Sequence, residues 1–224
     1  MDTRTDDHRT RFLQLALDAD ALRFGEFTLK SGRVSPYFFN AGRFDSGAAM
    51  AALAACYADA LDASGVPFYL LFGPAYKGIP LATALAFEFA RRGRDLPVAF
   101  NRKEAKAHGE GGQLIGASLQ GRRVLVVDDV ITAGTAVREA LETITAAGGE
   151  VAGVVIALDR QEALDPSQGR RSAAQALADE RGIPVVAVAT LDDLLAFASG
   201  MATLAEWRPA LEAYRDRYGS SDGG

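Results

Sequence analysis

Short apolar runs of strand length alternate along this chain with longer amphipathic stretches of helix length. Runs of consecutive apolar residues predict strands buried on both faces, which is typical of parallel sheets. Predicted strands lie at 68–72, 97–100, 123–128, 150–158 and 184–189, and predicted helices at 46–63, 78–92, 134–147, 172–181, 191–198 and 204–217. This alternation predicts an α/β fold in which helices flank a central, mainly parallel β-sheet.

The segment before this alternation has a different pattern. Apolar positions predict an amphipathic helix at about 3–21, and two short extended pieces follow it at 26–29 and 36–40. With 224 residues, the chain has the size of one domain with small additions. The expected parts are a hood at about 1–45, a core at about 46–200, a C-terminal helix at about 201–218 and a disordered tail at 219–224.

Charge and composition narrow the class of protein. The formal net charge of −5 argues against nucleic acid as a partner bound through a broad basic face. The N-terminal segment carries too many charges for a signal peptide, and no apolar stretch is long enough to span a membrane. The single cysteine, Cys56, lies in an Ala-rich run that favours core packing and cannot form an intramolecular disulfide. We therefore expect a cytoplasmic protein with no membrane partner.

The most informative segment is VLVVDDVITAGTA, from Val124 to Ala136. An apolar strand leads directly into Asp128 and Asp129, at the end of a parallel strand where ligands bind. The following turn of hydroxyl and glycine residues can aim backbone N–H groups at a phosphate, helped by the positive end of the next helix. Carboxylates accept hydrogen bonds from sugar hydroxyls and can hold a divalent cation directly or through water. The segment predicts a phosphorylated-sugar site, although two solvated acids would explain the pair alone.

A second candidate element is FGPAYKGIPLA, from Phe72 to Ala82. Here a predicted strand ends in a Gly-Pro turn, and a helix begins near Gly78. Tyr76 and Lys77 fall at the strand's carboxyl end, where an ammonium group can meet a phosphate. A lysine in water at the start of a helix explains this segment equally well.

A third element, NRKEAKAHGEGG at 101–112, is basic and glycine-rich within an acidic protein. Such a segment is too polar for a core and predicts a mobile loop whose cations gather around negative charges. The alternative is a solvated hairpin tip. Its cationic candidates are Arg102, Lys103, Lys106 and His108.

Two further segments contribute candidates for a flat, anionic ligand. The stretch FTLKSGRVSPYFFNAGRF carries Lys30 and the pair Phe38 and Phe39, which period-two alternation places on opposite faces of a strand. Ordinary core packing is the simpler role for these rings. Arg160 follows a predicted strand and offers a two-point contact to a carboxylate, whereas an ion pair with Asp159, Glu162 or another acid is the simpler explanation.

Taken together, these motifs resemble the ordered motif set of the bacterial orotate phosphoribosyltransferases, a branch of the type I phosphoribosyltransferase family. The acidic-pair motif is similar to the phosphoribosyl-diphosphate signature of many type I enzymes, and the segments containing Lys30 and Lys103 narrow the likeness to the orotate enzymes. Later segments, IPVVAVATLDDLL and EAYRDRYG, extend the resemblance over nearly the whole chain.

The resemblance implies the type I phosphoribosyltransferase fold and a pentosyltransferase activity. That activity is transfer of 5-phosphoribosyl from phosphoribosyl diphosphate to N1 of orotate, giving orotidine 5′-phosphate and diphosphate in pyrimidine biosynthesis. It also implies Mg2+ as cofactor and a homodimer in which Arg102, Lys106 and His108 reach the partner's active site. Position 107 is Ala, where we expect Asp in close relatives, so loop closure and its pH response are in question.

The resemblance also assigns roles to individual residues, without assigning metal ligands. The implied catalytic residues are Lys103, Lys106, Asp128 and Asp129. The implied phosphoribosyl-diphosphate-binding residues are Lys30, Tyr76, Lys77, Arg102, Lys103, Lys106, His108, Asp128, Asp129, Val130, Ile131, Thr132, Ala133, Gly134, Thr135 and Ala136. The implied orotate-binding residues are Phe38, Phe39, Thr132 and Arg160.

Two other functions compete with this interpretation. A phosphoribosyltransferase for another base would share the sugar-phosphate site, but a neutral base does not need the guanidinium of Arg160. A non-catalytic regulator that binds phosphoribosyl diphosphate and nucleic acid should carry a separate nucleic-acid-binding segment. The sequence has no identifiable helix-turn-helix.

Overall fold

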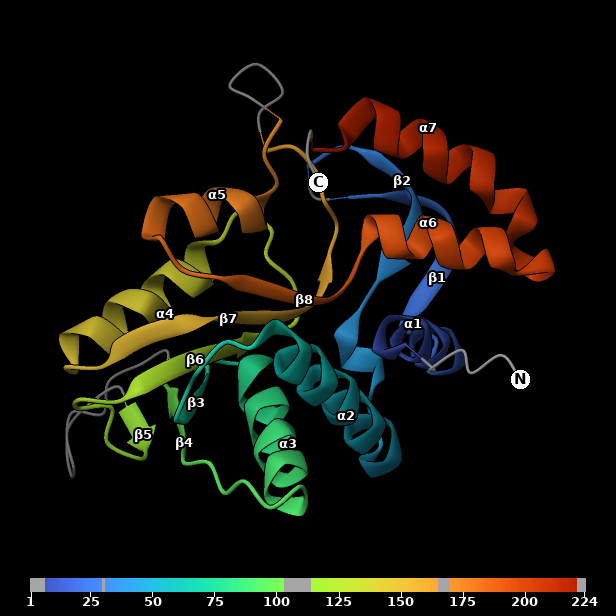
Figure 1. Ribbon diagram of the computed structural model, residues 1–224. Coiled ribbons are helices and arrows are strands. Elements are labelled where there is room, and N and C mark those ends of the chain that lie inside the picture. Colours follow the sequence, from blue (N-terminus) through green and yellow to red (C-terminus); the bar gives the residue numbers. More distant parts are fainter. Residues whose placement is uncertain (1–6, 30, 103–113, 165–169, 221–224) are drawn as a thin grey trace.

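A six-stranded sheet with the order β5-β4-β3-β6-β7-β8 forms the centre of the molecule (Figure 1). The computed structural model of the chain describes residues 7–29, 31–102, 114–164 and 170–220. The strands are β3 (Leu70–Gly73), β4 (Val98–Asn101), β5 (Leu114–Gly116), β6 (Arg123–Asp128), β7 (Glu150–Asp159) and β8 (Val185–Thr190). All neighbouring pairs are parallel except β4 and β5, which confirms the predicted mainly parallel α/β sheet.

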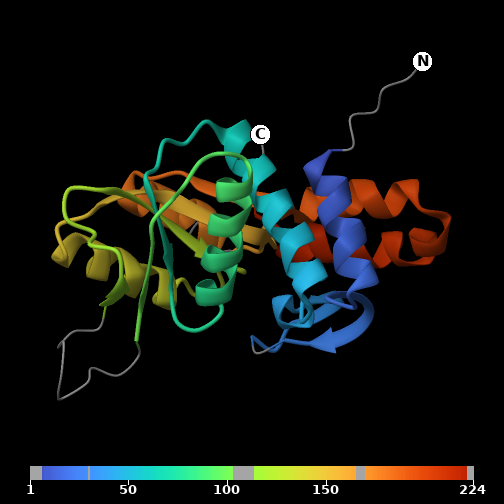
Figure 2. The ribbon, with the colours of Figure 1, turned by 90° about the horizontal axis from the view of Figure 1, so that it is seen from below.

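Helices cover both faces of this sheet. Helices α2 (Gly47–Ser64) and α3 (Gly78–Arg91) lie on one face, and α4 (Thr135–Ala146) and α5 (Ala173–Arg181) lie on the other (Figure 1). The remaining helical elements are α1 (His8–Asp18), α6 (Leu191–Gly200), α7 (Arg208–Tyr218) and the 3-10 helices η1 (Ala41–Arg43) and η2 (Ala202–Trp207). Viewed from below, α1, α6 and α7 gather with the N-terminal hairpin at one end of the sheet (Figure 2).

The central strands are buried on both faces, as their uninterrupted apolar sequence predicts. On β6, Leu125 and Val127 pack into the core that includes α2 and α3, whereas Val124 and Val126 pack into the core that includes α4 and α5. All four side chains are fully buried. Because each face is filled separately, the carboxyl end of β6 is held rigidly between two packed layers.

Local capping fixes several helix starts next to the sheet. The hydroxyl of Ser172 accepts a hydrogen bond from the backbone N–H of Gln175, whose side chain in turn accepts from the Ser172 backbone. Thr190 and Asp193 form the same reciprocal pair at the start of α6. Such capping boxes satisfy backbone donors that a helix end leaves unpaired.

The N-terminal hood is an antiparallel hairpin of β1 (Leu22–Thr28) and β2 (Val34–Phe39). The predicted alternation of Phe38 and Phe39 is confirmed. Phe39 packs toward the core against Phe12, with ring centroids 5.9 Å apart. Phe38 lies on the other face of the hairpin, beside Phe27 at 5.5 Å.

Three sequence expectations need correction. Strand β5 was not predicted, because three residues at a sheet edge are too short to show periodicity. The predicted helix at 204–217 is divided into η2 and α7, and Pro209 lies in the first turn of α7. Gly219 and Ser220 are not a disordered tail, since Gly219 bridges Glu162 and the Ser220 N–H donates to the Gln161 carbonyl at 2.6 Å.

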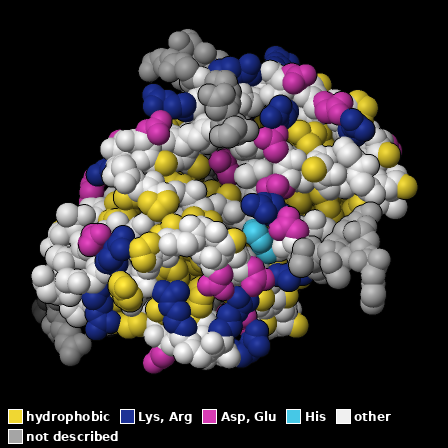
Figure 3. Space-filling view, viewed as in Figure 1, with side chains coloured by type: hydrophobic (Ala, Val, Ile, Leu, Met, Phe, Trp, Pro, Cys, Tyr) yellow, Lys and Arg dark blue, Asp and Glu magenta, His cyan; other side chains and the backbone are white. Residues whose placement is uncertain are grey.

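Surface charge and cysteine burial agree with the sequence-based expectations. Basic and acidic side chains are interspersed on the face shown in Figure 3. Cys56 is buried in the core of the α2 and α3 face. Within the described residues, no helix combines the length and the apolar character required to cross a bilayer.

Candidate active site

The acidic pair lies at the carboxyl end of β6, where Asp128 and Asp129 are only 8% and 6% exposed. The Tyr57 hydroxyl on α2 donates to the Asp128 carbonyl at 2.8 Å, and the Ala157 N–H on β7 donates to the Asp129 carbonyl at 2.9 Å. The Asp128 carboxylate itself accepts from the Asp129 N–H at 2.9 Å. Hydrogen bonds from two neighbouring elements to the main-chain carbonyls therefore fix the backbone that carries both carboxylates.

An ion pair connects this acidic pair to the neighbouring strand connection. The Lys77 ammonium lies 2.6 Å from a carboxylate oxygen of Asp129. Burial, together with the adjacent negative charge of Asp129, raises the pKa of Asp128, and the positive charge of Lys77 opposes this rise. The site therefore holds one carboxylate paired with an ammonium group beside a second carboxylate that protonates more easily than usual.

Two glycines allow Lys77 to reach the acidic pair. A Cβ atom at Gly78 would lie 2.6 Å from the Val127 carbonyl oxygen, and one at Gly73 would lie 2.3 Å from the Gly78 carbonyl oxygen. The connection between β3 and α3 therefore packs directly against β6 because neither position has a side chain. This connection is held from the other side by Asn101, whose side-chain oxygen accepts from the Ala75 N–H at 2.8 Å.

The predicted phosphate turn follows the acidic pair without interruption. Gly134 adopts a positive φ of 76° at the N-cap of α4 and provides no side-chain cap for the first-turn N–H groups. Thr132, Ala133, Thr135 and Ala136 are exposed, whereas Ile131 is buried as an anchor. An exposed turn before an uncapped helix N-terminus suits binding of an anion.

Arg138 stabilises this turn from within α4. Its guanidinium donates to the Ala133 carbonyl at 2.8 Å and to the Glu180 carboxylate on α5 at 2.9 Å. A Cβ atom at Gly134 would lie 2.7 Å from the same guanidinium, so the glycine leaves room for the Arg138 side chain. The turn is consequently braced against the rest of the α4 and α5 layer.

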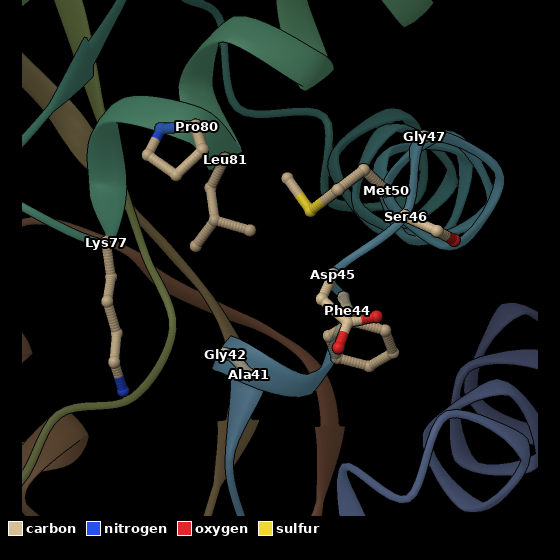
Figure 4. A pocket seen from close by; sticks show the side chains of 10 residues that line it. All are labelled: Ala41, Gly42, Phe44, Asp45, Ser46, Gly47, Met50, Lys77, Pro80 and Leu81. Carbon is tan, nitrogen blue, oxygen red and sulfur yellow. The ribbon is translucent and has the colours of Figure 1, made fainter.

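A hollow of about 420 Å³ lies beside this site (Figure 4). Lys77 and the first turn of α3 border one side, and the segment that leads from η1 into α2 borders the other. Its size falls in the range of small-molecule sites. Neither aspartate lines it, so the hollow adjoins the acidic pair through Lys77.

Arg160 lies just beyond the end of β7, with its side chain 14% exposed. Its Nε donates to the Glu162 carboxylate at 2.6 Å, and its guanidinium lies 4.6 Å from the centre of the Tyr37 ring. Of the acids considered from the sequence, Glu162 is the partner, because Asp159 instead accepts from the Gln161 N–H and the Ser172 hydroxyl. The ion pair is therefore internal, not on the surface.

The structure brings together only part of the predicted site. Asp128, Asp129, Lys77 and the turn at 130–136 meet at one edge of the sheet. Arg102 follows β4 directly and is half-buried. Tyr76 is largely exposed beside Lys77, and Phe39 serves the core of the hood. Lys30, Lys103, Lys106 and His108 lie outside the described residues.

Several residues that shape the site were not found from the sequence. Tyr57, Asn101 and Arg138 have no local motif that sets them apart, since their partners are distant or belong to ordinary helix surface. The spacing of Gly73 and Gly78 around Lys77 was the one available signal, because paired glycines often mark a close backbone approach. Within the described residues, no cluster of three or more His, Cys, Asp or Glu side chains offers a metal site.

Comparison with known proteins identifies the family to which this chain belongs. The model of the phosphoribosyl transferase domain family matches residues 45–182. An orotate phosphoribosyltransferase of Xanthomonas campestris pv. campestris (strain B100) is 75% identical over 218 residues, covering 97% of this chain and 99% of that protein. One from Stenotrophomonas maltophilia (strain K279a) is 71% identical over 213 residues, covering 95% of this chain and 97% of that protein.

Solved structures agree with these sequence similarities. The crystal structure of an orotate phosphoribosyltransferase from Francisella tularensis has a TM-score of 0.83 and 42% identity, and the match covers 93% of this chain and 99% of that chain. The enzyme of Mycobacterium tuberculosis H37Rv in complex with 5-phospho-alpha-D-ribosyl 1-diphosphate has a TM-score of 0.61 and 26% identity, covering 83% and 98%. The predicted fold is thereby confirmed, and this chain belongs to the orotate phosphoribosyltransferases of the type I phosphoribosyltransferase family.

Proposed function

We propose that this chain transfers the 5-phosphoribosyl group from phosphoribosyl diphosphate to N1 of orotate, giving orotidine 5′-phosphate and diphosphate. The bond between ribose C1 and the diphosphate oxygen breaks, the bond between C1 and N1 forms, and the proton that N1 gives up passes to the departing diphosphate or to solvent. The observation that carries the proposal is the continuity of the acidic pair with the exposed turn at 130–136, at one rigid edge of the sheet.

The two halves of this edge suit the two ends of the phosphoribosyl group. Asp128 and Asp129 can accept hydrogen bonds from the ribose hydroxyls, because both carboxylates lie beside the strand end and accept only a few bonds from the protein. The turn from Val130 to Ala136 offers backbone N–H groups to the 5′-phosphate. Holding both ends places C1 in a defined position relative to the incoming base.

Departure of diphosphate leaves positive charge on C1 and the ring oxygen, so two opposite charges develop as the bond breaks. The acidic pair lies on the side of the positive charge. Lys77, which already contacts Asp129 at 2.6 Å, together with Tyr76, Lys30, Arg102, Lys103, Lys106 and His108, is assigned to the diphosphate side. Groups whose contacts strengthen as charge develops lower the barrier, and Lys103 and Lys106 are proposed for that role.

Magnesium is proposed as the cofactor. Two carboxylates at the site suit a Mg2+ ion that is held chiefly by the oxygens of phosphoribosyl diphosphate, because Mg2+ is commonly coordinated by substrate phosphates, waters and one or two carboxylates. Asp128 and Asp129 are the carboxylates that would hold it, directly or through water. When bound, the ion would neutralise negative charge on the diphosphate.

The orotate end is assigned to Phe38, Phe39, Thr132 and Arg160. Thr132 is exposed in the phosphate turn, and Arg160 follows the strand next to β6. A guanidinium suits the orotate carboxylate because it offers two parallel N–H donors. The Phe39 ring packs against Phe12, so we assign the contact of Phe39 with orotate to its backbone.

The active assembly is proposed to be a homodimer in the cytoplasm. In this arrangement Arg102, Lys106 and His108 of one protomer complete the site of the other. Lys106→Ala and Asp129→Asn should each be strongly impaired alone, and mixing them should restore activity in the heterodimers if the loop acts across the interface. Mixing that restores nothing, while the two chains are shown to exchange, would place the loop at its own site.

The reaction is tested by loss of orotate absorbance on mixing enzyme, magnesium, orotate and phosphoribosyl diphosphate. A diphosphate-release assay then compares orotate with uracil and adenine, and we expect turnover with orotate and with neither of the other bases. The Arg160→Ala variant should weaken orotate binding with little change for phosphoribosyl diphosphate. An equal loss for both substrates would count against the orotate assignment of Arg160.

A further inference from the structure

The Arg160 guanidinium is enclosed on three sides by groups from separate parts of the chain. The Tyr37 ring of β2 lies against its face at 4.6 Å. A carboxylate oxygen of Glu162 lies 2.6 Å from both Nε and Nη2. The hydroxyls of Ser35 and Tyr214 lie 3.4 and 3.5 Å from Nη2, at the long limit for a hydrogen bond.

Glu162 is itself held by the C-terminal helix and the hood. The Tyr214 hydroxyl on α7 donates to the same carboxylate oxygen that receives Arg160, at 2.8 Å, while Arg33 lies 3.4 Å from the other oxygen. Burial and the nearby Glu162 charge raise the pKa of Tyr214 to about 12, so this hydroxyl remains a donor at neutral pH. Backbone bonds from Ala163 to Tyr218 and from Ser220 to Gln161 tie the same segment to the chain terminus.

This enclosure leaves one edge of Arg160 available. Within the described part of the chain, the guanidinium makes its contacts through Nε and Nη2, and Nη1 makes no hydrogen bond. A carboxylate can approach the free N–H groups of Nη1 and the remaining N–H of Nη2, while Glu162 keeps the edge formed by Nε and Nη2. Arg33 and Arg160 place two positive charges beside Glu162, and burial raises the pKa of the neighbouring Asp159, which disfavours a second negative charge there.

We propose that Glu162 and Tyr214 are positioning residues that hold the Arg160 guanidinium in the orientation in which its open edge receives the orotate carboxylate. The C-terminal helix thereby sets affinity for the base and leaves affinity for phosphoribosyl diphosphate unchanged. This inference rests on the proposed role of Arg160. Its physical basis is preorganisation, because an arginine that already sits in one rotamer loses less conformational entropy on binding.

The test compares steady-state kinetics of Tyr214→Phe and Glu162→Gln with a matched control, Tyr218→Phe. The control removes a hydroxyl from the same helix, on a ring that packs against Tyr214 at 5.1 Å and for which no hydrogen bond to Arg160 or Glu162 exists in the described structure. We expect KM for orotate to rise about threefold in Tyr214→Phe and about tenfold in Glu162→Gln. KM for phosphoribosyl diphosphate and kcat should stay within about twofold.

The outcomes separate this inference from the proposed function. Equal increases in KM for both substrates, or a Tyr214→Phe variant that behaves like Tyr218→Phe, would overturn the positioning role even if Arg160→Ala weakens orotate binding. If Arg160→Ala leaves KM for orotate unchanged, the orotate contact itself fails and the inference fails with it. Because Tyr214→Phe keeps the aromatic ring in place, its result stands even if Glu162→Gln misfolds.

Discussion

The Lys77 ammonium lies 2.6 Å from the Asp129 carboxylate, although the two residues are 52 positions apart in the chain. Lys77 is 55% exposed and Asp129 is 8% exposed at the side chain. The pair therefore joins a half-exposed cation to a buried anion, at the edge shared by β3 and β6. A ligand that contacts either residue alters the electrostatic environment of the other.

Replacing Lys77 by Met should shift the pH dependence of catalysis. The positive charge of Lys77 lowers the pKa of Asp128, so its removal raises that pKa further. The acid limb of kcat/KM for phosphoribosyl diphosphate should move to higher pH by about half a unit. Lys77→Arg, which retains the charge, should leave the limb in place. An unmoved limb in Lys77→Met would show that the charge does not act on Asp128.

Replacing Asp128 by Asn should stabilise the fold and depress activity. Because the folded-state pKa of Asp128 is raised, its neutral form is favoured, and that stability is lost as pH rises through the folded pKa. At pH 8 the variant should gain about 1 kcal/mol in the free energy of unfolding, and the gain should shrink toward pH 4. Urea denaturation at both pH values measures this, with exposed Asp95→Asn as the control. A destabilised variant at pH 8 would refute the argument.

Adding one methyl group at Gly78 should disturb the site through the backbone. The new Cβ atom would lie 2.6 Å from the Val127 carbonyl oxygen and 2.5 Å from Pro74. We expect Gly78→Ala to cost about 2 kcal/mol in the free energy of unfolding and to raise KM for phosphoribosyl diphosphate. Gly200→Ala is the control, because nothing lies within 4 Å of its Cβ position. Equal stability of the two variants would contradict this packing account.

Removing the Arg138 guanidinium should destabilise the turn at 130–136. Arg138→Ala loses the 2.8 Å bond to the Ala133 carbonyl, and we expect KM for phosphoribosyl diphosphate to rise about fivefold. Glu180→Gln removes only the charge of the exposed partner and should have a smaller effect. Steady-state kinetics on both variants measures this difference. If Arg138 acts only through its surface ion pair with Glu180, the two variants should raise KM for phosphoribosyl diphosphate equally, which would contradict bracing of the turn.

Loss of Lys106 should reduce turnover more than substrate affinity. The residue lies outside the described part of the chain, and the expectation follows from its proposed contact with the leaving diphosphate. Loss of one strong transition-state contact costs about 3 kcal/mol, so kcat of Lys106→Ala should fall roughly a hundredfold. Lys106→Arg should recover part of the activity. Turnover that matches the unmodified enzyme would exclude the assigned role.

The order of elements and the location of the acidic pair follow from the printed sequence. Uninterrupted apolar runs such as Val124 to Val127 predicted strands buried on both faces, and β6 occupies the predicted residues. The turn after Asp129 was also recognisable, because the phosphate-binding role proposed for it depends on adjacent residues. Such features are local, since the period of side-chain burial and the geometry of a turn depend on neighbours in the chain.

The choice of side-chain partners was decided only by tertiary structure. From the sequence, Lys77 was equally well explained as a solvated lysine, and Arg160 had several acids within reach. The close approach of Gly78 to β6 brings Lys77 to Asp129, and the return of α7 over the hood brings Tyr214 to Glu162. These contacts depend on distances between elements far apart in the chain, and hydrophobic periodicity carries no information about such distances.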